Sequence, residues 1–362
     1  MGAESIATVW ALLIATAVFL YVVMDGFDLG VGILFPAIHA REHRDVAVNS
    51  VAPVWDGNET WLVLGGGGLF AVFPLAYAVI LPALYMPLII MLLALIFRGV
   101  SFEMRFRAET RAQQLWWDWS FSGGSMVAAF AQGIALGALV QGIAVEERAY
   151  AGGWWDWLTP FSVLTGLALM AGYGMLGACW LYWKTEGELQ DQARRLARRL
   201  GGLTLFFIAA VSAIMPFLQP EFRARWFDFP ALIAALPVPV LVVLLAWRYF
   251  RALADTPETE AAGAEHPHLS HDAPPPQRFV WRDSIPFACA LGLFFLSYTG
   301  LGISMWPMMV PPEITIWDAA APRSTQIFLL VGAAVLIPII LIYTGYVYWL
   351  FRGKIRAGEG YH

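Results

Sequence analysis

Residues 6–36 read IATVWALLIATAVFLYVVMDGFDLGVGILFP, and this stretch decides the class of the protein. It contains no basic residue and exceeds the about 20 mostly apolar residues that a helix needs to cross a bilayer. The run is too long for one simple span, and its second half carries Asp25 and Asp28. We therefore expect that half to project beyond the hydrocarbon layer or to be buried in protein.

Further apolar runs follow, each long enough for a membrane-spanning helix. They lie near residues 54–74, 77–97, 120–142, 159–182, 202–219, 229–248, 283–305 and 326–350. A tight turn around residues 73–75 is expected to join the second and third spans. The sequence thus predicts an all-α, polytopic membrane protein with about nine transmembrane helices, in a single integral-membrane domain over residues 1–362.

The overall composition agrees with a membrane protein. Of the 362 residues, 59% are hydrophobic and 14% are charged, against about a quarter charged residues in soluble domains. The net charge of −5 excludes a nucleic-acid binder that depends on a basic surface. Cys179 and Cys289 lie in apolar runs, which excludes a disulfide framework and a Cys-rich metal site. No basic segment precedes the first apolar run, so we expect no cleavable signal peptide.

The basic residues predict the orientation, because short cytoplasmic loops retain Lys and Arg. With the N-terminus outside, alternating spans place most of the 22 Lys and Arg residues in inner segments. The outer segments hold only Arg148, Arg223, Arg225 and Arg323. We therefore expect the N-terminus outside and the C-terminus in the cytoplasm.

The histidines bear on any redox role. All six lie in predicted cytoplasmic segments: His39, His43, His266, His268, His271 and His362. Proteins that hold heme between their own helices usually supply axial histidines from those helices. We therefore expect no heme and no metal ligated by this chain; a Met or Cys ligand stays open, although the 12 methionines fit packing better. Residues 255–276, rich in Ala, Glu, His and Pro, are expected to form a flexible cytoplasmic linker.

Four carboxylates near the inner membrane surface are the candidate proton-transfer residues. Asp25 and Asp28 are spaced i, i+3 and so share one face of the first helix. Asp56 and Glu59 open the second helix at a similar depth. Ionisable groups inside a membrane cost about 2.5–3.5 kcal/mol each at a helix centre and usually mark ion or proton pathways. A chain of such acids could relay protons from the cytoplasm.

Each of these features has a structural alternative. The acids could cap helix ends, or form ion pairs with Arg98 or Arg105 at the inner end of the third helix. Trp55 could contact a quinone head group, or lie at the lipid interface. The four glycines at 65–68 predict close approach of another helix, with a gap for a small apolar ligand as the alternative.

Five segments, in order along the chain, resemble subunit II of the cytochrome bd-type quinol oxidases. They are MDGFDLGVG at 24–32, WDGNETWL at 55–62, FRGVSFE at 97–103, WDW at 117–119 and PIILIYT at 338–344. The outer loop with Pro311, Pro312 and Trp317 resembles the cyanide-insensitive branch more closely.

The resemblance implies a subunit of a respiratory oxidase in a bacterial cytoplasmic membrane, which reduces oxygen to water with electrons from quinol. Heme b and heme d would be ligated by subunit I, and this chain would be its non-heme partner, built as two four-helix bundles plus one peripheral helix. In family members the position matching Asp56 is linked to proton uptake, and the aspartates of the first helix lie nearby; Glu59 stands where relatives carry Gln. A small third subunit, membrane lipids and a structural quinone are further expected partners, and no residue of this chain is expected to be catalytic.

Two other classes remain at this point. A proton-coupled secondary transporter also uses carboxylates and glycine-interrupted helices, but its polar groups would lie near the bilayer midplane, whereas these acids lie toward one side. A structural scaffold with merely satisfied acids is the third possibility. Reduced heme bands that co-purify with the chain would separate the first class from both others.

Overall fold

The computed structural model describes residues 2–254 and 281–355, and these are largely helical. Eight helical segments among them are long and apolar enough to cross a membrane. The main helices of these segments are α1 (Ala3–Leu34), α5 (Tyr85–Phe106), α6 (Arg111–Gln141), α7 (Pro160–Lys184), α8 (Gly187–Ile214), α11 (Pro237–Ala254), α13 (Trp281–Met305) and α15 (Arg323–Leu350).

A further long helix, α3 (Trp55–Val72), has 18 residues and packs against α1 and α15. Its first two turns carry Asp56 and Glu59, so its composition is less apolar than that of the other eight. With α3, the described part of the chain holds nine long helices. The prediction of an all-α protein with about nine transmembrane helices is confirmed.

The connection between the second and third spans was predicted only in part. α3 ends at Val72 and the short helix α4 (Pro74–Ala83) begins at Pro74, so the chain breaks at Phe73 as expected, but α5 begins only at Tyr85 and the helix predicted over 77–97 is divided in two. Pro74 starts α4, where a missing N–H is tolerated, and the chain breaks again at Leu84, shortly before Pro87. Residues 77–97 are apolar throughout, so hydropathy gave no sign of this break.

Two helices begin well before their apolar runs. α6 starts at Arg111, behind a capping box in which Thr110 and Gln113 bond each other's backbone. α8 starts at Gly187, in a charged stretch, because its first turns are amphipathic: Leu189 and Ala193 are buried while the arginines of the same turns are more exposed.

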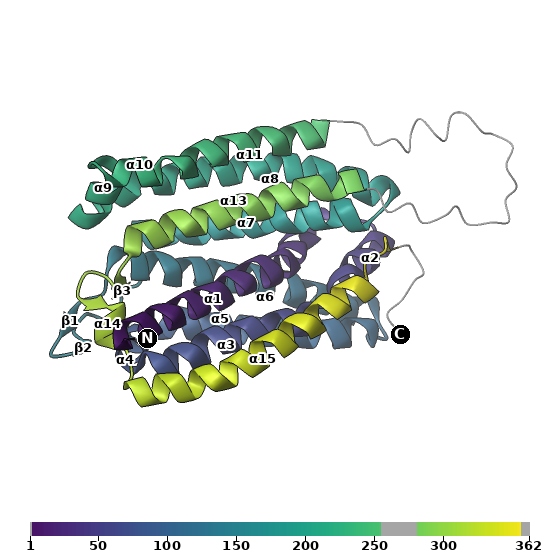
Figure 1. Ribbon diagram of the computed structural model, residues 1–362. Helices are drawn as coiled ribbons and strands as arrows, with labels where there is room; N and C mark the ends of the chain where they lie inside the picture. Colours follow the sequence, from purple (N-terminus) through teal and green to yellow (C-terminus); the bar gives the residue numbers. More distant parts are fainter. Residues whose placement is uncertain (1, 255–280, 356–362) are drawn as a thin grey trace, which may run out of the picture.

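The helices form two bundles (Figure 1). Bundle one consists of α1, α3, α5 and α6, and bundle two of α7, α8, α11 and α13. The bundles meet where α7 packs against α1 and α6, and α15 lies outside bundle one, beside α1 and α3. This arrangement confirms two four-helix bundles plus one peripheral helix.

Glycine allows the closest crossing between the bundles. A Cβ at Gly30 of α1 would lie 1.9 Å from the carbonyl oxygen of Tyr173 in α7, which no side chain tolerates. Only two glycines of the run at 65–68 lie in close contact with another helix. A Cβ at Gly65 or Gly68 would touch α1, whereas a Cβ at Gly66 or Gly67 would have open space.

The two ends of the molecule differ. At one end lie the N-terminus, two small hairpins and α14; at the other lie α2 and the end of α15 (Figure 1). The remaining elements are η1 (Phe35–Ala37), α2 (Arg41–Val51), β1 (Val145–Glu146), β2 (Ala149–Tyr150), η2 (Met215–Phe217), α9 (Pro220–Phe227), α10 (Ala231–Ala235), β3 (Met308–Val310), β4 (Ile314–Thr315) and α14 (Ile316–Ala319). The predicted linker at 255–276 and four of the histidines lie outside the described residues.

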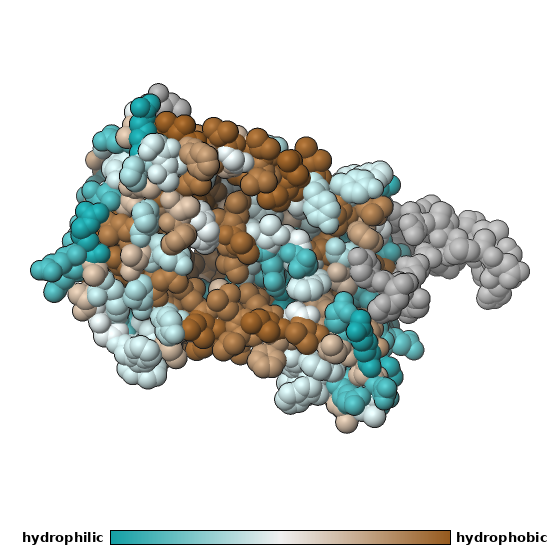
Figure 2. All heavy atoms as spheres, turned by 90° about the horizontal axis from the view of Figure 1, so that it is seen from below, coloured by the Kyte–Doolittle hydropathy of each residue, from teal (hydrophilic) through white to brown (hydrophobic). Residues whose placement is uncertain are grey.

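A hydrophobic band separates these polar ends. Figure 2 shows it on the face seen from below, between more hydrophilic regions. On α15, Phe328, Val331 and Ile342 are each at least 65% exposed. Such a surface needs lipid or protein cover.

Candidate functional site

Arg98 of α5 lies at the centre of the site and is completely buried. Its Nη1 atom is 3.0 Å from Oδ1 of Asp25 on α1 and 2.9 Å from Oε1 of Glu59 on α3. Asp25 is also completely buried, whereas the Glu59 side chain is 27% exposed. Three helices of bundle one therefore converge on a single guanidinium group.

Asp28, one turn beyond Asp25, is buried beside this ion pair. Asn58 of α3 donates a hydrogen bond of 2.7 Å from Nδ2 to Oδ2 of Asp28. The Tyr348 hydroxyl of α15 donates to Oδ1 of Asn58 over 3.0 Å. Asn58 thus connects the peripheral helix to the buried acids.

We call Asp25, Asp28, Glu59 and Arg98 the acid cluster. Its three carboxyl groups face one guanidinium group, and an unpaired buried charge is costly. The cluster is therefore electrically neutral when two of its three carboxyl groups carry a proton. Both carboxylate oxygens of Asp25, which meets Arg98 as an ion pair, have no hydrogen-bond partner among the described residues, and neither do Oδ1 of Asp28 and Nε and Nη2 of Arg98. The cluster therefore keeps further bonding capacity.

The structure gathers three of the four predicted acids and separates the fourth. Asp56 is exposed on α3, on a different face from the buried Asn58. It precedes Glu59 by three residues, so the two carboxylates are neighbours along the helix. Glu59 therefore lies between an exposed acid and the buried pair.

Trp55 packs on protein. Its ring stacks on Phe102, with ring centroids 4.9 Å apart and an interplanar angle of 9°, and the Arg98 guanidinium lies 5.9 Å from the Trp55 ring. The indole thus covers one side of the acid cluster. A contact of Trp55 with quinone or lipid stays a prediction.

The structural alternative for the acids was an ion pair with Arg98 or Arg105. In the structure Asp25 and Glu59 pair with Arg98. Arg105 joins a separate network: its Nε donates to Asp118 and its Nη1 to Asp45, each over 2.6 Å. Arg44 donates to the same Asp118 over 2.9 Å. This network holds equal numbers of positive and negative groups and ties α2 to α5 and α6.

The sequence interpretation missed a line of neutral polar residues next to the cluster. Gln132 of α6 donates from Nε2 to the Tyr21 hydroxyl over 2.6 Å, and Tyr173 of α7 donates to Oε1 of Gln132 over 2.8 Å. Two signals were available. Tyr21 lies four residues before Asp25, on the same helix face, and Gln132 is a lone amide inside an apolar run.

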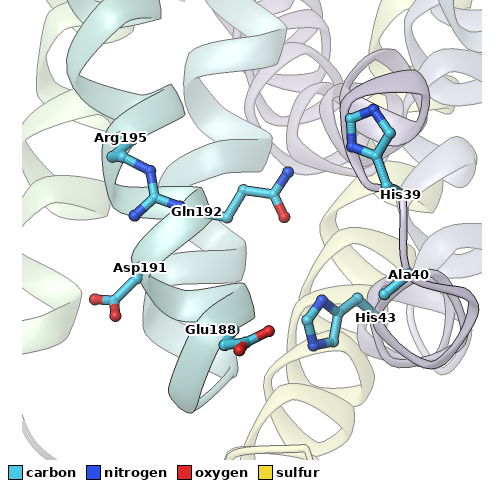
Figure 3. Close-up of a pocket in the computed structure, with 7 residues that line it drawn as sticks. All are labelled: His39, Ala40, His43, Glu188, Asp191, Gln192 and Arg195. Carbon is cyan, nitrogen blue, oxygen red and sulfur yellow. The ribbon is translucent and has the colours of Figure 1, made fainter.

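The described histidines, His39 and His43, lie away from the acid cluster. They line a surface pocket of about 410 Å³ beside the first turns of α8, where His43 faces Glu188 (Figure 3). Within the described residues, no group of three or more His, Cys, Asp or Glu side chains could hold a metal ion. The described spanning helices also carry no histidine, so they lack the usual axial ligand and do not fit a His-ligated heme.

Comparisons with known proteins agree on one family. Residues 6–351 match the model of the family described as cytochrome bd terminal oxidase subunit II. The chain is 31% identical to cytochrome bd-I ubiquinol oxidase subunit 2 of Escherichia coli K12, over 98% of this chain and 97% of the relative. It is 30% identical to cytochrome bd ubiquinol oxidase subunit 2 of Bacillus subtilis, over 66% of this chain and 70% of the relative.

A solved structure shares the fold. A chain of the bd oxidase from Geobacillus thermodenitrificans superimposes with a TM-score of 0.73 at 17% sequence identity, covering 96% of this chain and 98% of that one. The sequence matches extend over both bundles and α15. The chain therefore belongs to the family of cytochrome bd terminal oxidase subunit II and is a multi-pass membrane subunit of an oxidoreductase complex.

Proposed function

We propose that this chain delivers protons from the cytoplasm to a partner subunit that oxidises quinol and reduces oxygen to water. Heme b and heme d would be held by that partner, subunit I, because the described spans of this chain do not fit a His-ligated heme. The hemes supply the redox chemistry. This chain's own residues would take up, hold and pass on the protons that water formation consumes.

The acid cluster is the observation that carries this proposal. A buried site with more carboxyl groups than cations holds exchangeable protons, and ionisable groups at this depth usually mark proton pathways. The Glu59 side chain is partly exposed and contacts Arg98, so Glu59 would be the residue through which protons enter the cluster. Asp56, exposed one turn earlier, suits collection of protons or contact with the partner subunit.

The position of the cluster supports uptake from the cytoplasm. Arg98 lies in the second half of α5, toward the end of the molecule that carries α2 and the Arg44–Arg105 network. The positive-inside rule assigns such an end to the cytoplasm. The N-terminus would then be outside the inner membrane. A small third subunit, lipids and a structural quinone would cover the exposed hydrophobic surfaces.

A proton-coupled transporter is not favoured. The family match extends over almost the whole chain. The charges of the acid cluster also lie within one bundle, whereas a transporter built from repeats places its binding groups at the interface between the repeats.

The test compares Asp25→Asn and Asp28→Asn in the complex purified with subunit I. We expect each to lose most of its quinol oxidase turnover while heme content is kept. Without the Asp25 carboxylate, Arg98 would hold one of the two remaining carboxyl groups ionised; without Asp28, a proton-holding group is lost. Asp283→Asn is the matched control, because Asp283 is a buried carboxylate in bundle two that pairs with Lys354 over 2.8 Å.

The outcomes separate proton delivery from assembly. Wild-type turnover in both cluster variants would refute the proposal. Loss of heme in the cluster variants, with heme kept in Asp283→Asn, would mean that the acids serve assembly. Asp56→Asn tests the exposed acid separately: unchanged turnover would remove Asp56 from the pathway.

Glu59→Gln tests the entrance. Glutamine keeps an oxygen that can accept from Arg98. We expect turnover to fall by less than in Asp28→Asn, because Asp56 and the buried pair remain. A loss as large as that of Asp28→Asn would make Glu59 the obligatory entrance.

A further inference from the structure

The buried amide of Asn58 lies between Asp28 and the peripheral helix, and its partners fix its orientation. Its Nδ2 atom is 3.3 Å from the Met24 carbonyl oxygen and 2.7 Å from Oδ2 of Asp28. A backbone carbonyl oxygen only accepts hydrogen bonds, so the amide nitrogen must face it. The amide oxygen then faces the Tyr348 hydroxyl, which donates to it over 3.0 Å.

Tyr348, which completes this arrangement, packs against the core of both bundles. Its ring lies edge-on to Phe27 of α1, with ring centroids 6.5 Å apart, and to Trp180 of α7, with ring centroids 6.4 Å apart. In α15, all of which the structure describes, Gln326 is the one residue that is buried. Tyr348 therefore enters the core from a helix that is otherwise largely exposed, and its hydroxyl is held in place beside Asn58.

Asp28 differs from the other two carboxyl groups of the acid cluster. Asp25 and Glu59 each have an oxygen within 3.0 Å of Nη1 of Arg98. Asp28 forms no ion pair within the described part of the chain, although it is completely buried. Since a buried charge without a paired cation is costly, the neutral cluster places one of its two protons on Asp28.

The two oxygens of Asp28 are not equivalent. Oδ2 accepts from Asn58, whereas Oδ1 has no hydrogen-bond partner among the described residues. In a protonated carboxyl group the carbonyl oxygen is the better acceptor, so a donor 2.7 Å from Oδ2 favours a proton on Oδ1. We propose that Asn58, oriented by Tyr348, places the proton of Asp28 on Oδ1 and keeps it available for transfer. This rests on the proposed proton delivery and refines it.

The opposite orientation of the amide would trap the proton. The amide oxygen would then face Oδ2 of Asp28 and accept a hydrogen bond from a proton on that atom. The Met24 carbonyl opposes this rotation, because the amide oxygen would face it acceptor to acceptor. The Tyr348 hydroxyl opposes it too, because it would no longer donate to the amide oxygen. Asn58 and Tyr348 are therefore positioning residues, and neither takes up a proton itself.

The experiment compares Asn58→Leu and Tyr348→Phe with Gln190→Leu in the complex purified with subunit I. Leucine is similar in shape to asparagine but donates no hydrogen bond. Gln190 is the matched control, because it is a buried amide of bundle two that donates to a carboxylate, Oδ2 of Asp283, over 3.1 Å. Infrared spectroscopy reports a protonated carboxyl group through its C=O stretch, and Asp28→Asn identifies the band of Asp28. Quinol oxidase turnover is measured in the same samples.

In the wild type we expect an Asp28 band at the low wavenumber of a carbonyl group that accepts a hydrogen bond. In Asn58→Leu the band should move to higher wavenumber. Turnover should fall about tenfold, because a hydrogen bond to the charged form is missing when Asp28 releases its proton. Tyr348→Phe should shift the band in the same direction but less, because the bond from Tyr348 polarises the amide. Gln190→Leu should change neither readout.

An unchanged band or unchanged turnover in Asn58→Leu would overturn the proposal, as would a wild type without a band that Asp28→Asn removes. If Asn58→Leu loses its hemes, Tyr348→Phe decides, and an unchanged band there overturns the proposal. Equal changes in Gln190→Leu would also overturn it.

Failure here is separate from failure of proton delivery. Wild-type turnover in both Asp25→Asn and Asp28→Asn refutes delivery. An inactive Asp28→Asn beside an unchanged Asn58→Leu refutes only the role of the amide.

Discussion

Bundle one and bundle two are of similar size, yet they fill their interiors differently. In the described residues of bundle one, Asp25, Asp28 and Arg98 are completely buried within the helices. In bundle two the interior contacts are neutral, as where Tyr249 bonds the Ala197 carbonyl and lies 3.4 Å from the Cys179 sulfur. Its buried charges, Lys184 and Asp283, lie at helix ends.

This contrast separates packing from function. Bundle two shows that four helices of this length can pack without a charge in their middle. Buried ion pairs are weak contributors to stability, because desolvation offsets much of their attraction. The charges of bundle one are therefore not needed for the fold, and the proposed proton delivery would account for their presence.

The largest expected effect comes from Arg98→Met, which removes the cation and leaves three carboxyl groups around its place. Breaking a buried pair costs about 3–5 kcal/mol. We expect a large loss of heme-containing complex and a lower melting temperature in whatever assembles. Arg107→Met is the matched control on the same segment, because Arg107 and its partner Glu103 are about 70% exposed and such pairs contribute about 1 kcal/mol or less. Equal stability of Arg98→Met and Arg107→Met would contradict the assignment of Arg98 to a buried ion pair.

Gly30→Ala tests the contact between the bundles. The added methyl group would overlap the Tyr173 carbonyl, so α1 and α7 must separate, and overpacking of this kind costs about 1–3 kcal/mol or more. We expect a lower melting temperature of the complex. Gly67→Ala adds the same group where nothing lies within 4 Å and should be neutral within this chain. A lower melting temperature for Gly67→Ala than for Gly30→Ala would show that the bundles meet elsewhere.

Tyr249→Phe tests whether bundle two is only structural. The variant loses one buried hydroxyl bond, worth about 1 kcal/mol. The melting temperature should fall slightly while turnover stays at the wild-type value at every pH. A shifted pH profile would place bundle two in the proton pathway and remove the contrast between the bundles.

The smallest effect is expected at the exposed face of helix α14, where the hydroxyl and backbone N–H of Thr315 lower the pKa of Asp318. Because the pKa is lower in the folded state, this carboxylate stabilises the fold above its ordinary pKa, and the contribution fades as the pH falls through the folded value. Asp318→Asn should therefore melt slightly below wild type at neutral pH and together with it in acid. A difference that grows in acid would contradict this sign.

The fold class could be predicted from the sequence, and three of the four candidate acids do meet in the structure, for identifiable reasons. Long apolar runs and the asymmetry of Lys and Arg define spans without tertiary information, and Asp25 stands out because a charge in such a run is rare. The break at Leu84 was missed because both sides are equally apolar. The amphipathic start of α8 was missed because its charged residues lower the mean hydropathy of the segment, although one face of the helix is apolar.

The grouping of the site depends on tertiary contacts. That Arg98 rather than Arg105 reaches Asp25 depends on how α5 rotates against α1. Asp56 and Glu59 look equivalent in sequence, and only the packing of α3 turns one outward and the other toward Arg98. The hydrogen bonds from Tyr173 to Gln132 and from Gln132 to Tyr21 join three helices through neutral residues, which composition does not single out.

Proton uptake by the fully reduced complex in lipid vesicles tests the central claim most directly. A pH-sensitive dye is placed on the side of α2, and oxygen is added to wild type and to Asp28→Asn with equal heme content. We predict that wild type consumes protons from that side and that Asp28→Asn loses most of this uptake while its hemes still react with oxygen. Undiminished uptake in Asp28→Asn, or uptake by wild type from the opposite side, would contradict delivery through bundle one.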